Sequence, residues 1–202
     1  EIPIAIKNTF QPQDAGTLIT KNTNNNQQPV KGISYIEEVT LITLEGSGMV
    51  GIPGFSKRLF ETLSFNNINI ILITQASSEL SICIGISDQD ALKAKEVIDE
   101  VFEFEIQQQK VSPLVLEQHL CILALVGDNM KNHQGLSGQM FSALGKNNVN
   151  IRAIAQGSTE KNISAVIQQS DAKKALNTLH EQFFEEKIKQ LNLFVTGVGN
   201  VG

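Results

Sequence analysis

The hydrophobic positions of this chain repeat every second residue in some segments and every third or fourth residue in others. The β-branched runs 39–44, 68–74 and 80–86 predict strands, and a polar turn separates the last two. The segment that opens at Gly54 carries apolar residues at helical spacing and stops at the asparagine pair 66–67. The first part of the pattern is therefore strand, helix, strand, strand.

A second helix is predicted to follow from Ser87, where a serine with an aspartate three residues later resembles a capping box. The run 104–110 is then a plausible last strand. The order β-α-β-β-α-β predicts a ferredoxin-like sandwich, which is an α+β fold with two helices on one face of an antiparallel sheet.

The chain contains an internal repeat without insertions. Residues 41–105 match residues 122–186 at a constant offset of 81, and about two dozen of roughly 65 positions are identical. A fold duplicated within one chain is the economical explanation. The strongest matches are Met49 with Met130, Gly54 with Gly135, Asn69 with Asn150, and Gln75 with Gln156.

The second copy leaves little room for its last strand, because its second helix (171–184) runs almost directly into the apolar stretch 191–196. An extended stretch at 30–36 precedes the first copy. We predict that this stretch supplies the missing edge strand of the second copy, so that the first copy is inserted within the second. Pairing of this stretch with residues 104–110 would refute that arrangement.

The composition and the placement of Cys and His disfavour several classes of function. The chain has 202 residues, a net charge of −5, one Tyr and no Trp, which disfavours a nucleic-acid binder. Cys83 and Cys121 lie in apolar runs and are expected to be small buried thiols in a reducing, cytoplasmic setting. His119 and His180 have no metal-ligating residues at suitable spacing, and no nucleophile lies beside a histidine. We therefore expect no metal, no membrane span and no catalysis in this fragment.

The last residues contain Gly197-x-Gly199-x-x-Gly202, the spacing of a dinucleotide-binding turn. No helix, second strand or ribose-binding acid follows it, so we expect no cofactor to bind here and interpret the motif as the first residues of a further domain. An autonomous NAD-binding enzyme is the alternative.

Gly46-x-x-Met49 and Gly54 before a helix, followed by Asn-Asn-Ile-Asn-Ile and Gln-x-Ser-Ser-Glu, resemble the ACT domain, an amino-acid-sensing module. The tandem pair resembles the regulatory region of the bifunctional aspartokinase/homoserine dehydrogenases. The start of the chain, 2–10 with 16–19, is similar to the end of the aspartokinase catalytic domain, and 191–202 to the start of the dehydrogenase Rossmann domain. This resemblance implies four parts: 1–28 (kinase end plus polar linker), 36–111 (first ACT subdomain), 30–36 with 115–190 (second ACT subdomain), and 191–202 (truncated Rossmann domain).

The resemblance also implies a parent protein that uses ATP with Mg and NAD(P). It implies a homodimer or higher homo-oligomer through the ACT sheets, and a small-molecule effector rather than a nucleic acid or membrane partner. By analogy, the first copy would influence the kinase and the second the dehydrogenase.

An amino-acid effector needs donors for its carboxylate, acceptors for its ammonium and a matched pocket. The helix N-termini at Gly54 and Gly135 suit the carboxylate, and Asn69 and Asn150 suit the ammonium, although a glycine at a turn is usually only a turn residue and an asparagine after a helix is usually a C-cap. Gln75 and Gln156 could pair with a hydroxyl, whereas the methionines could be core residues and His133 a solvated loop residue. The candidate ligand-binding residues are Met49, Ile52, Gly54, Phe55, Asn69, Ile70, Gln75, Met130, His133, Gly135, Leu136, Asn150, Ile151 and Gln156.

The effector is predicted to be threonine. In lysine-sensing relatives, the resemblance implies, an acidic residue after the first helix receives the side-chain ammonium, but the matching residues here are Ile71 and Arg152. A buried lysine head group would lack a partner, whereas threonine needs only a hydroxyl partner. The expected function is threonine-dependent feedback inhibition of aspartokinase and homoserine dehydrogenase. A lysine- or methionine-sensing domain and a non-sensing dimerisation module are the alternatives.

Overall fold

The computed structural model describes residues 2–20, 29–128, 130, 133–157 and 161–185. Near the N-terminus β1 (Ile4–Ile6) and β2 (Thr17–Ile19) form an antiparallel pair. The expected polar linker and the glycine motif at 197–202 lie outside the described residues. No helix in the described ranges is long and apolar enough to cross a membrane.

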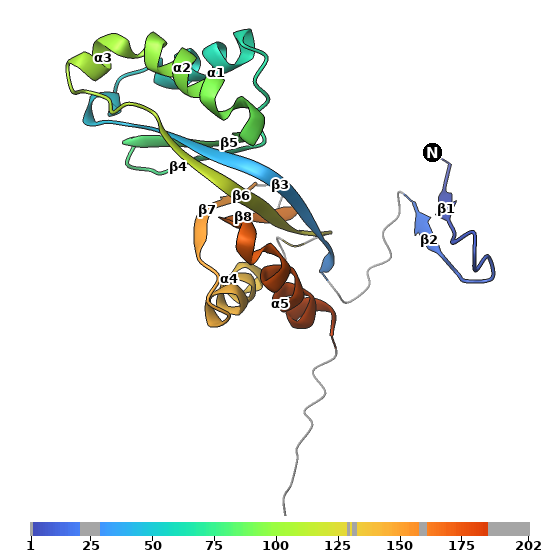
Figure 1. Ribbon diagram of the computed structural model, residues 1–202. Coiled ribbons are helices and arrows are strands. Elements are labelled where there is room, and N and C mark those ends of the chain that lie inside the picture. The colour runs from blue at the N-terminus through green and yellow to red at the C-terminus, as the bar shows by residue number, and fades with distance from the viewer. Residues whose placement is uncertain (1, 21–28, 129, 131–132, 158–160, 186–202) are drawn as a thin grey trace, which may run out of the picture.

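The two copies share one antiparallel sheet of six strands in the order β4-β5-β3-β6-β8-β7 (Figure 1). The strands are β3 (Val30–Glu45), β4 (Leu72–Gln75), β5 (Ser81–Ser87), β6 (Val115–Gly127), β7 (Ile151–Gln156) and β8 (Asn162–Gln168). The helices are α1 (Phe55–Phe65), α2 (Ala91–Val101) and α3 (Glu103–Gln107) in the first copy, and α4 (Leu136–Lys146) and α5 (Ala172–Phe184) in the second. The predicted α+β class with two tandem units is confirmed.

The two longest strands, β3 and β6, lie side by side at the centre and each serves both copies. Residues 39–45 of β3 pair with β5 of the first copy, and residues 30–36 of β3 pair with 122–127 of β6. In return, residues 115–117 of β6 pair with 41–43 of β3. The extended stretch before the first copy thus pairs with the first strand of the second copy and not with residues 104–110, while the domain boundaries stay a prediction.

Each central strand carries one irregularity where it passes between the copies. Glu38 has φ 55° and His119 has φ 59°, and these residues are matched by the repeat. Val39 faces Leu120 between the two register shifts, and both residues are fully buried. A bulge adds a residue and increases the local twist, so each strand can turn from one copy toward the other without ending.

The predicted last strand at 104–110 was wrong. This segment contains helix α3, in which the Ile106 N–H donates to the Phe102 carbonyl. The spacing of Phe102 and Ile106 suits a helix as well as a strand, so the pattern alone did not decide. The edge strand of the first copy is instead the start of β6. The strand expected from residue 68 begins only at Leu72.

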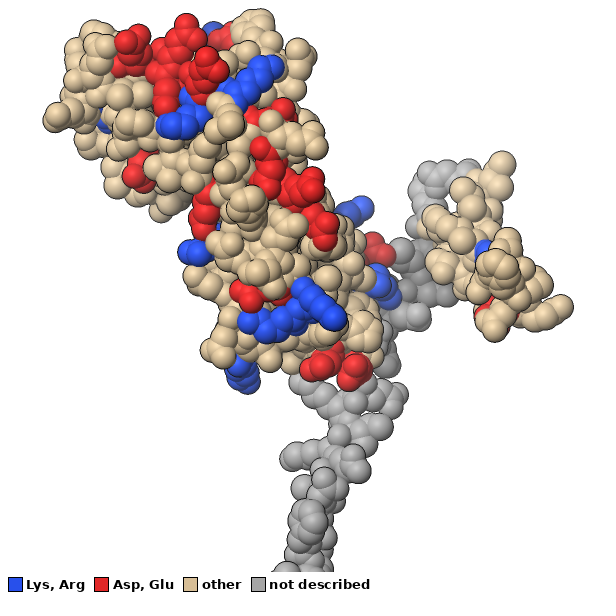
Figure 2. Space-filling view, in the orientation of Figure 1, with Lys and Arg blue, Asp and Glu red and all other residues tan. Residues whose placement is uncertain are grey.

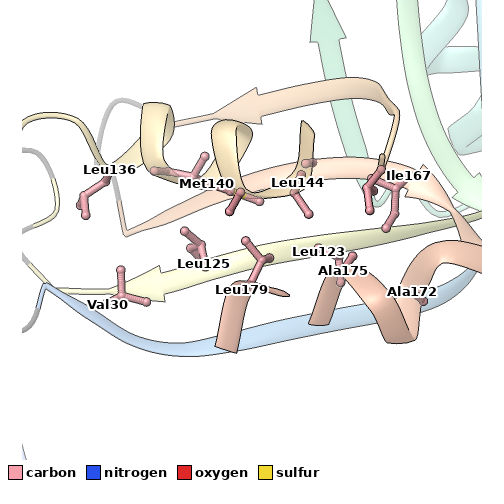
Figure 3. Close-up of a cluster of buried hydrophobic side chains, with 14 of the residues drawn as sticks. Val30, Leu123, Leu125, Leu136, Met140, Leu144, Ile167, Ala172, Ala175 and Leu179 are labelled. Carbon is pink, nitrogen blue, oxygen red and sulfur yellow. The ribbon is translucent and has the colours of Figure 1, made fainter. Parts of the chain in front are cut away.

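Three apolar clusters hold the fold together. In the second copy, α4 and α5 bury Leu136, Met140, Leu144 and Leu179 against β6 and β8 (Figure 3). A matching cluster lies beneath α1 and α2 in the first copy. The third cluster lies on the opposite face of the sheet and contains Val39, Leu41, Leu72, Leu120, Ile122 and Val166. Residues from both copies meet there, and β4 contacts β7 although the two strands stand at opposite ends of the strand order.

The cysteines are free thiols. Burial raises the pKa of Cys83, and burial also raises the pKa of Cys121 to about 11. A thiol with a raised pKa stays protonated near neutral pH and is a poor nucleophile.

Arg58 on α1 joins the three helices of the first copy. Its guanidinium lies 4.4 Å from the ring centroid of Phe102 and donates to the Val101 carbonyl at 2.6 Å. It also forms an ion pair with Glu105 on α3, and this hydrogen bond lowers the pKa of Glu105. The arginine therefore anchors α3 to the helix layer. Acidic side chains gather over the same helices (Figure 2). Glu96 and Glu100 on α2 and Glu103 on α3 are exposed.

Replacing a buried leucine should cost far more than replacing an exposed one. Leu144 is 0% exposed in the core, whereas Leu92 on α2 is 75% exposed. We expect Leu144→Ala to lower the free energy of unfolding by about 2–5 kcal/mol and Leu92→Ala to change it by no more than about 0.5 kcal/mol. Urea unfolding followed by circular dichroism measures both, and equal costs would contradict the assigned core.

The Arg58–Glu105 pair should make stability sensitive to acid. Because the pKa of Glu105 is lowered in the folded state, its contribution is fully present above the unfolded pKa of about 4.3 and is lost as the pH falls through the folded value. Arg58→Met should therefore flatten the fall in unfolding free energy below about pH 4, compared with the exposed control Lys57→Met. Identical acid profiles for the two variants would show that the pair does not contribute.

Candidate functional site

The same turn precedes the first helix of each copy. Gly54 and Gly135 occupy the N-cap positions of α1 and α4 with φ 107° and φ 85°, in the left-handed region. Within the described residues no side chain caps either helix. The amides of the first turn, at the positive end of the helix dipole, therefore remain available to an anion, as the sequence predicted for a carboxylate.

In the second copy this turn lies next to Gln156. The Ser137 hydroxyl in the first turn of α4 is 3.2 Å from the Gln156 side-chain oxygen and can donate to it. Among the described contacts the matched pair Ser56 and Gln75 is not joined in this way. A hydrogen bond thus joins the first turn of α4 to β7 in the second copy, whereas no described hydrogen bond joins Gln75 to α1 in the first copy.

Gln75 and Gln156 line one groove of about 680 Å³ on the face of the sheet that the helices leave open. We call this the inter-copy groove, because β4 of the first copy borders a floor built by β3, β6, β7 and β8. None of the described residues that line it is charged. They are Ser34, Ile36, Ile71, Leu72, Ile73, Thr74, Gln75, Ile122, Ala124, Val126, Ile154, Ala155, Gln156, Gly157, Asn162 and Ser164.

The other predicted ligand-binding residues lie elsewhere. Met49, Phe55, Met130 and Leu136 belong to the helix-side cores. The remaining placements are as follows: Asn69, Asn150 and Ile52 are exposed, Ile70 and Ile151 are half-buried against the cores, and Gly54 forms the turn before α1. A bulge between Ile151 and Ala153 interrupts the alternation of β7, so the six-residue spacing of Asn150 and Gln156 does not place the two side chains on one face.

Two further hollows lie at the helices of the second copy. The first, which we call the helix-layer hollow, measures about 440 Å³ and is lined by Pro29, Val30, His133, Gln134, Leu136, Gln139, Gln182 and Phe183. The second, of about 410 Å³, contains Gly135 and shares Gln139 and Gln182 with it. Of the candidate residues of the second copy, Gln156 thus lines the inter-copy groove, His133 and Leu136 line the helix-layer hollow, and Gly135 lines the hollow of about 410 Å³.

The sequence missed the polar floor of the inter-copy groove. Ser34, Asn162 and Ser164 lie in strands, where a small polar residue usually only faces solvent. They become groove residues because the sheet curls until β4 reaches β7, and no local pattern reports that curl.

The two positions that bear on effector charge differ between the copies. Ile71 and Ile36 on β3 both line the inter-copy groove. The residues matched to them by the repeat, Arg152 and Glu117, form an ion pair with 2.9 Å between Nε and Oε1. The Glu117 carboxylate is thus already neutralised, and neither position offers a free acid.

Comparison with known proteins identifies the family. The ACT domain family model matches residues 42–102 and 123–183, one segment for each copy and more than half of the chain in total. The chain belongs to the ACT domain family. The matched segments contain both Gly54 and Gly135 turns and both glutamine strands, so these features occur once in each ACT domain.

The relatives of this ACT pair are amino-acid biosynthetic enzymes. The chain is 39% identical over 201 residues to the bifunctional aspartokinase/homoserine dehydrogenase of Haemophilus influenzae, and the match covers the whole chain but 24% of that protein. The chain thus spans about a quarter of the length of such relatives.

Solved structures agree with this placement. Clostridium acetobutylicum aspartate kinase superimposes with a TM-score of 0.79 at 29% identity, over 90% of this chain and 42% of that one. Escherichia coli aspartokinase III in complex with lysine and aspartate gives 0.71 at 25% identity, over 91% and 39%. No group of three or more His, Cys, Asp or Glu in the described ranges could hold a metal ion.

The left-handed turn before α4 gives a direct test of the ACT turn geometry. Gly135 has φ 85°, whereas Gly138 lies inside α4, and an added Cβ would meet nothing within 4 Å at either position. Gly135→Ala should destabilise the chain by about 1–2 kcal/mol because of backbone strain. Gly138→Ala should stabilise it by about 0.5–1 kcal/mol. Thermal unfolding measures both, and effects of the same sign would contradict the turn conformation.

Proposed function

We propose that this ACT pair is an allosteric sensor of threonine that regulates the aspartokinase and homoserine dehydrogenase activities of a parent protein. The observation that carries the proposal is the inter-copy groove, in which matched glutamines from both copies border a hollow whose described lining residues carry no charge. A carboxamide both donates and accepts hydrogen bonds, so Gln75 and Gln156 suit a neutral hydroxyl.

The turn before α4 supports an amino acid as the ligand. The Gln156 side chain lines the groove and also accepts from the Ser137 hydroxyl in the first turn of α4, so a zwitterion that hydrogen-bonds Gln156 is linked to this helix N-terminus through Ser137. The Asn162 and Ser164 side chains on the groove floor offer further acceptors for its ammonium. The ligand-binding role of these residues is part of the proposal.

Lysine fits the groove less well, although lysine is present in the aspartokinase III complex. A lysine ammonium in the inter-copy groove would find no carboxylate among the described lining residues, and the Glu117 carboxylate is already paired with Arg152. An unpaired buried ammonium costs several kcal/mol, whereas a threonine hydroxyl needs one partner. The lack of a carboxylate among the described lining residues therefore favours threonine over lysine as the effector.

Binding in the groove would act on the arrangement of the two copies. The groove is bordered by β4 from one copy and β7 from the other, so a ligand that contacts both stabilises one relative position of these strands. A coupling of about 1–3 kcal/mol is typical when a ligand prefers one of two arrangements. We propose that the attached catalytic domains respond to this preference.

A homodimer is part of the proposal. In the described part of the chain β4 pairs only with β5, and β7 only with β8, so each has an outer edge without a strand partner. An open edge of this kind can pair with another chain. Sedimentation of the chain with and without threonine tests it, and a monomer under both conditions would remove the dimer.

Calorimetry of the chain with threonine, valine, lysine, methionine and NAD tests the effector. Valine has nearly the shape of threonine without the hydroxyl, so we expect threonine to bind at least about 10-fold more tightly than valine. Tight lysine or methionine binding would replace threonine as the effector, and NAD binding would favour the enzyme alternative. If no amino acid binds while a dimer persists, the pair serves only for dimerisation.

The two glutamines should carry the affinity. Gln75→Ala and Gln156→Ala should each weaken threonine binding by about 1–3 kcal/mol, because each removes a hydrogen-bonding carboxamide. Gln108→Ala, at an exposed position outside the groove, is the matched control and should leave binding unchanged. Unaltered affinity in the double variant would remove both glutamines from the site.

A further inference from the structure

Among the matched positions at which the helix layers of the two copies differ is Arg58 in the first copy, which is Gln139 in the second. In the first copy the Arg58 guanidinium covers the Phe102 ring, which is 0% exposed, and donates to the Val101 carbonyl. The space between α1 and the end of α2 is thus filled by a cation from the chain itself.

In the second copy no residue of the described part of the chain fills the same space. The residues matched to Arg58, Val101 and Phe102 are Gln139, Gln182 and Phe183, and all three line the helix-layer hollow of about 440 Å³. Gln139 is shorter than arginine and uncharged. Phe183 is conserved in type between the copies, yet its ring is only half-buried. The residue matched to Glu105 is at position 186, outside the described residues.

The open space retains the features that hold a cation in the first copy. Helix α5 ends at Phe184, and among the described residues no backbone N–H caps it, whereas the Phe102 N–H caps α2. Carbonyls at a helix C-terminus form the negative end of the dipole, and an aromatic face attracts a cation. Glu181 and Glu185 are exposed in the same turn, where Glu185 lies 3.7 Å from His180 between Oε1 and Nδ1, and His133 is the one titratable side chain among the described residues that line the hollow.

We propose that the helix-layer hollow binds a guanidinium group, which stacks on Phe183 and donates to the carbonyl groups at the end of α5. A guanidinium fits better than an ammonium because it is planar and can stack and donate at the same time, as Arg58 does. The group comes from a free guanidine compound or from an arginine side chain of another domain.

This site is separate from the proposed threonine site. Val30 and Leu136, which line the hollow, belong to the helix-side core, whereas the inter-copy groove lies on the other face of the sheet. Threonine calorimetry and guanidine titration therefore succeed or fail independently.

Titration of the isotope-labelled chain with ethylguanidine, followed by NMR, tests the site directly. We expect saturable shifts at Gln139 and Phe183 with a dissociation constant on the order of 1 mM, and weaker shifts with propylamine. Gln139→Arg should abolish these shifts by filling the hollow, and should raise the unfolding temperature by roughly 2–4 °C above that of the uncharged control Gln139→Met. No saturable shift, or a Gln139→Arg variant no more stable than Gln139→Met, would overturn the proposal.

The first copy provides the reciprocal test. Arg58→Gln should open the matching space, and ethylguanidine should then restore part of the lost unfolding temperature in this variant. A folded Arg58→Gln variant without this rescue would overturn the comparison between the copies on which the proposal rests.

The source of the group follows from two further ligands. If L-arginine binds about 10-fold or more tightly than ethylguanidine, its amino-acid groups are recognised and the ligand is a free metabolite. If N-acetyl-arginine methylamide binds as well as L-arginine, the site accepts an arginine side chain within a polypeptide. Both results require the hollow, and neither is expected in Gln139→Arg.

Discussion

The structure depends on the antiparallel pairing of β3 with β6, because these two strands form the centre of the sheet in both copies at once. Residues 30–36 of β3 complete the sheet of the second copy, and residues 115–117 of β6 complete that of the first. Neither half can pair all its strands without the other. The buried Val39 and Leu120 face each other where the strands exchange roles, and the positive φ of Glu38 and His119 is the local strain that this exchange requires. Asp88 stabilises the chain where the two strands exchange roles. Its Oδ1 accepts a hydrogen bond of 2.5 Å from the hydroxyl of the buried Thr40, and its Oδ2 lies 3.8 Å from Nδ1 of His119.

The sequence predicted the two repeated copies well but predicted poorly the segments that connect them. The constant offset of the repeat predicted two equivalent sandwiches, because insertions are absent and identical residues fall at turns, caps and core positions. The sequence could not distinguish a strand from a helix at 104–110, where alternation and helical spacing coincide. In the structure this segment contains helix α3, and Arg58 holds it through Glu105. The sequence also divided β3 in two at Glu37 and Glu38, since a bulge with two charged residues looks like a loop in one dimension.

The residues of the candidate site were likewise predictable, but their arrangement in space was not. Repetition singled out Gln75 and Gln156 as residues of interest, and the structure brings both to one groove. Their meeting was not predictable, because β4 and β7 are the outermost strands and approach each other only through the curl of the whole sheet. The curl in turn follows from the third cluster, where Leu72 and Val166 pack with the central strands on the face that has no helices. The groove is thus a consequence of packing between the copies rather than a feature of either copy.

Differences between matched positions carry information that the identities do not. Identical residues such as Gly54 and Gly135 are required twice because each copy must build the same turn, so they report the fold. The paired replacements, Ile36 with Ile71 against Glu117 with Arg152, give one side of the pseudo-symmetric sheet a neutral apolar wall and the other an ion pair. In the helix layer, Arg58 fills a space that Gln139 leaves open, although the aromatic ring beneath is kept as Phe102 and Phe183. Stability does not require the two copies to differ at these positions, because either set of residues could stabilise both copies. In the first copy Arg58 itself contacts the ring of Phe102. In the second copy the ring of Phe183 is kept but Gln139 does not cover it, so this ring is the part of the contact that a ligand can complete.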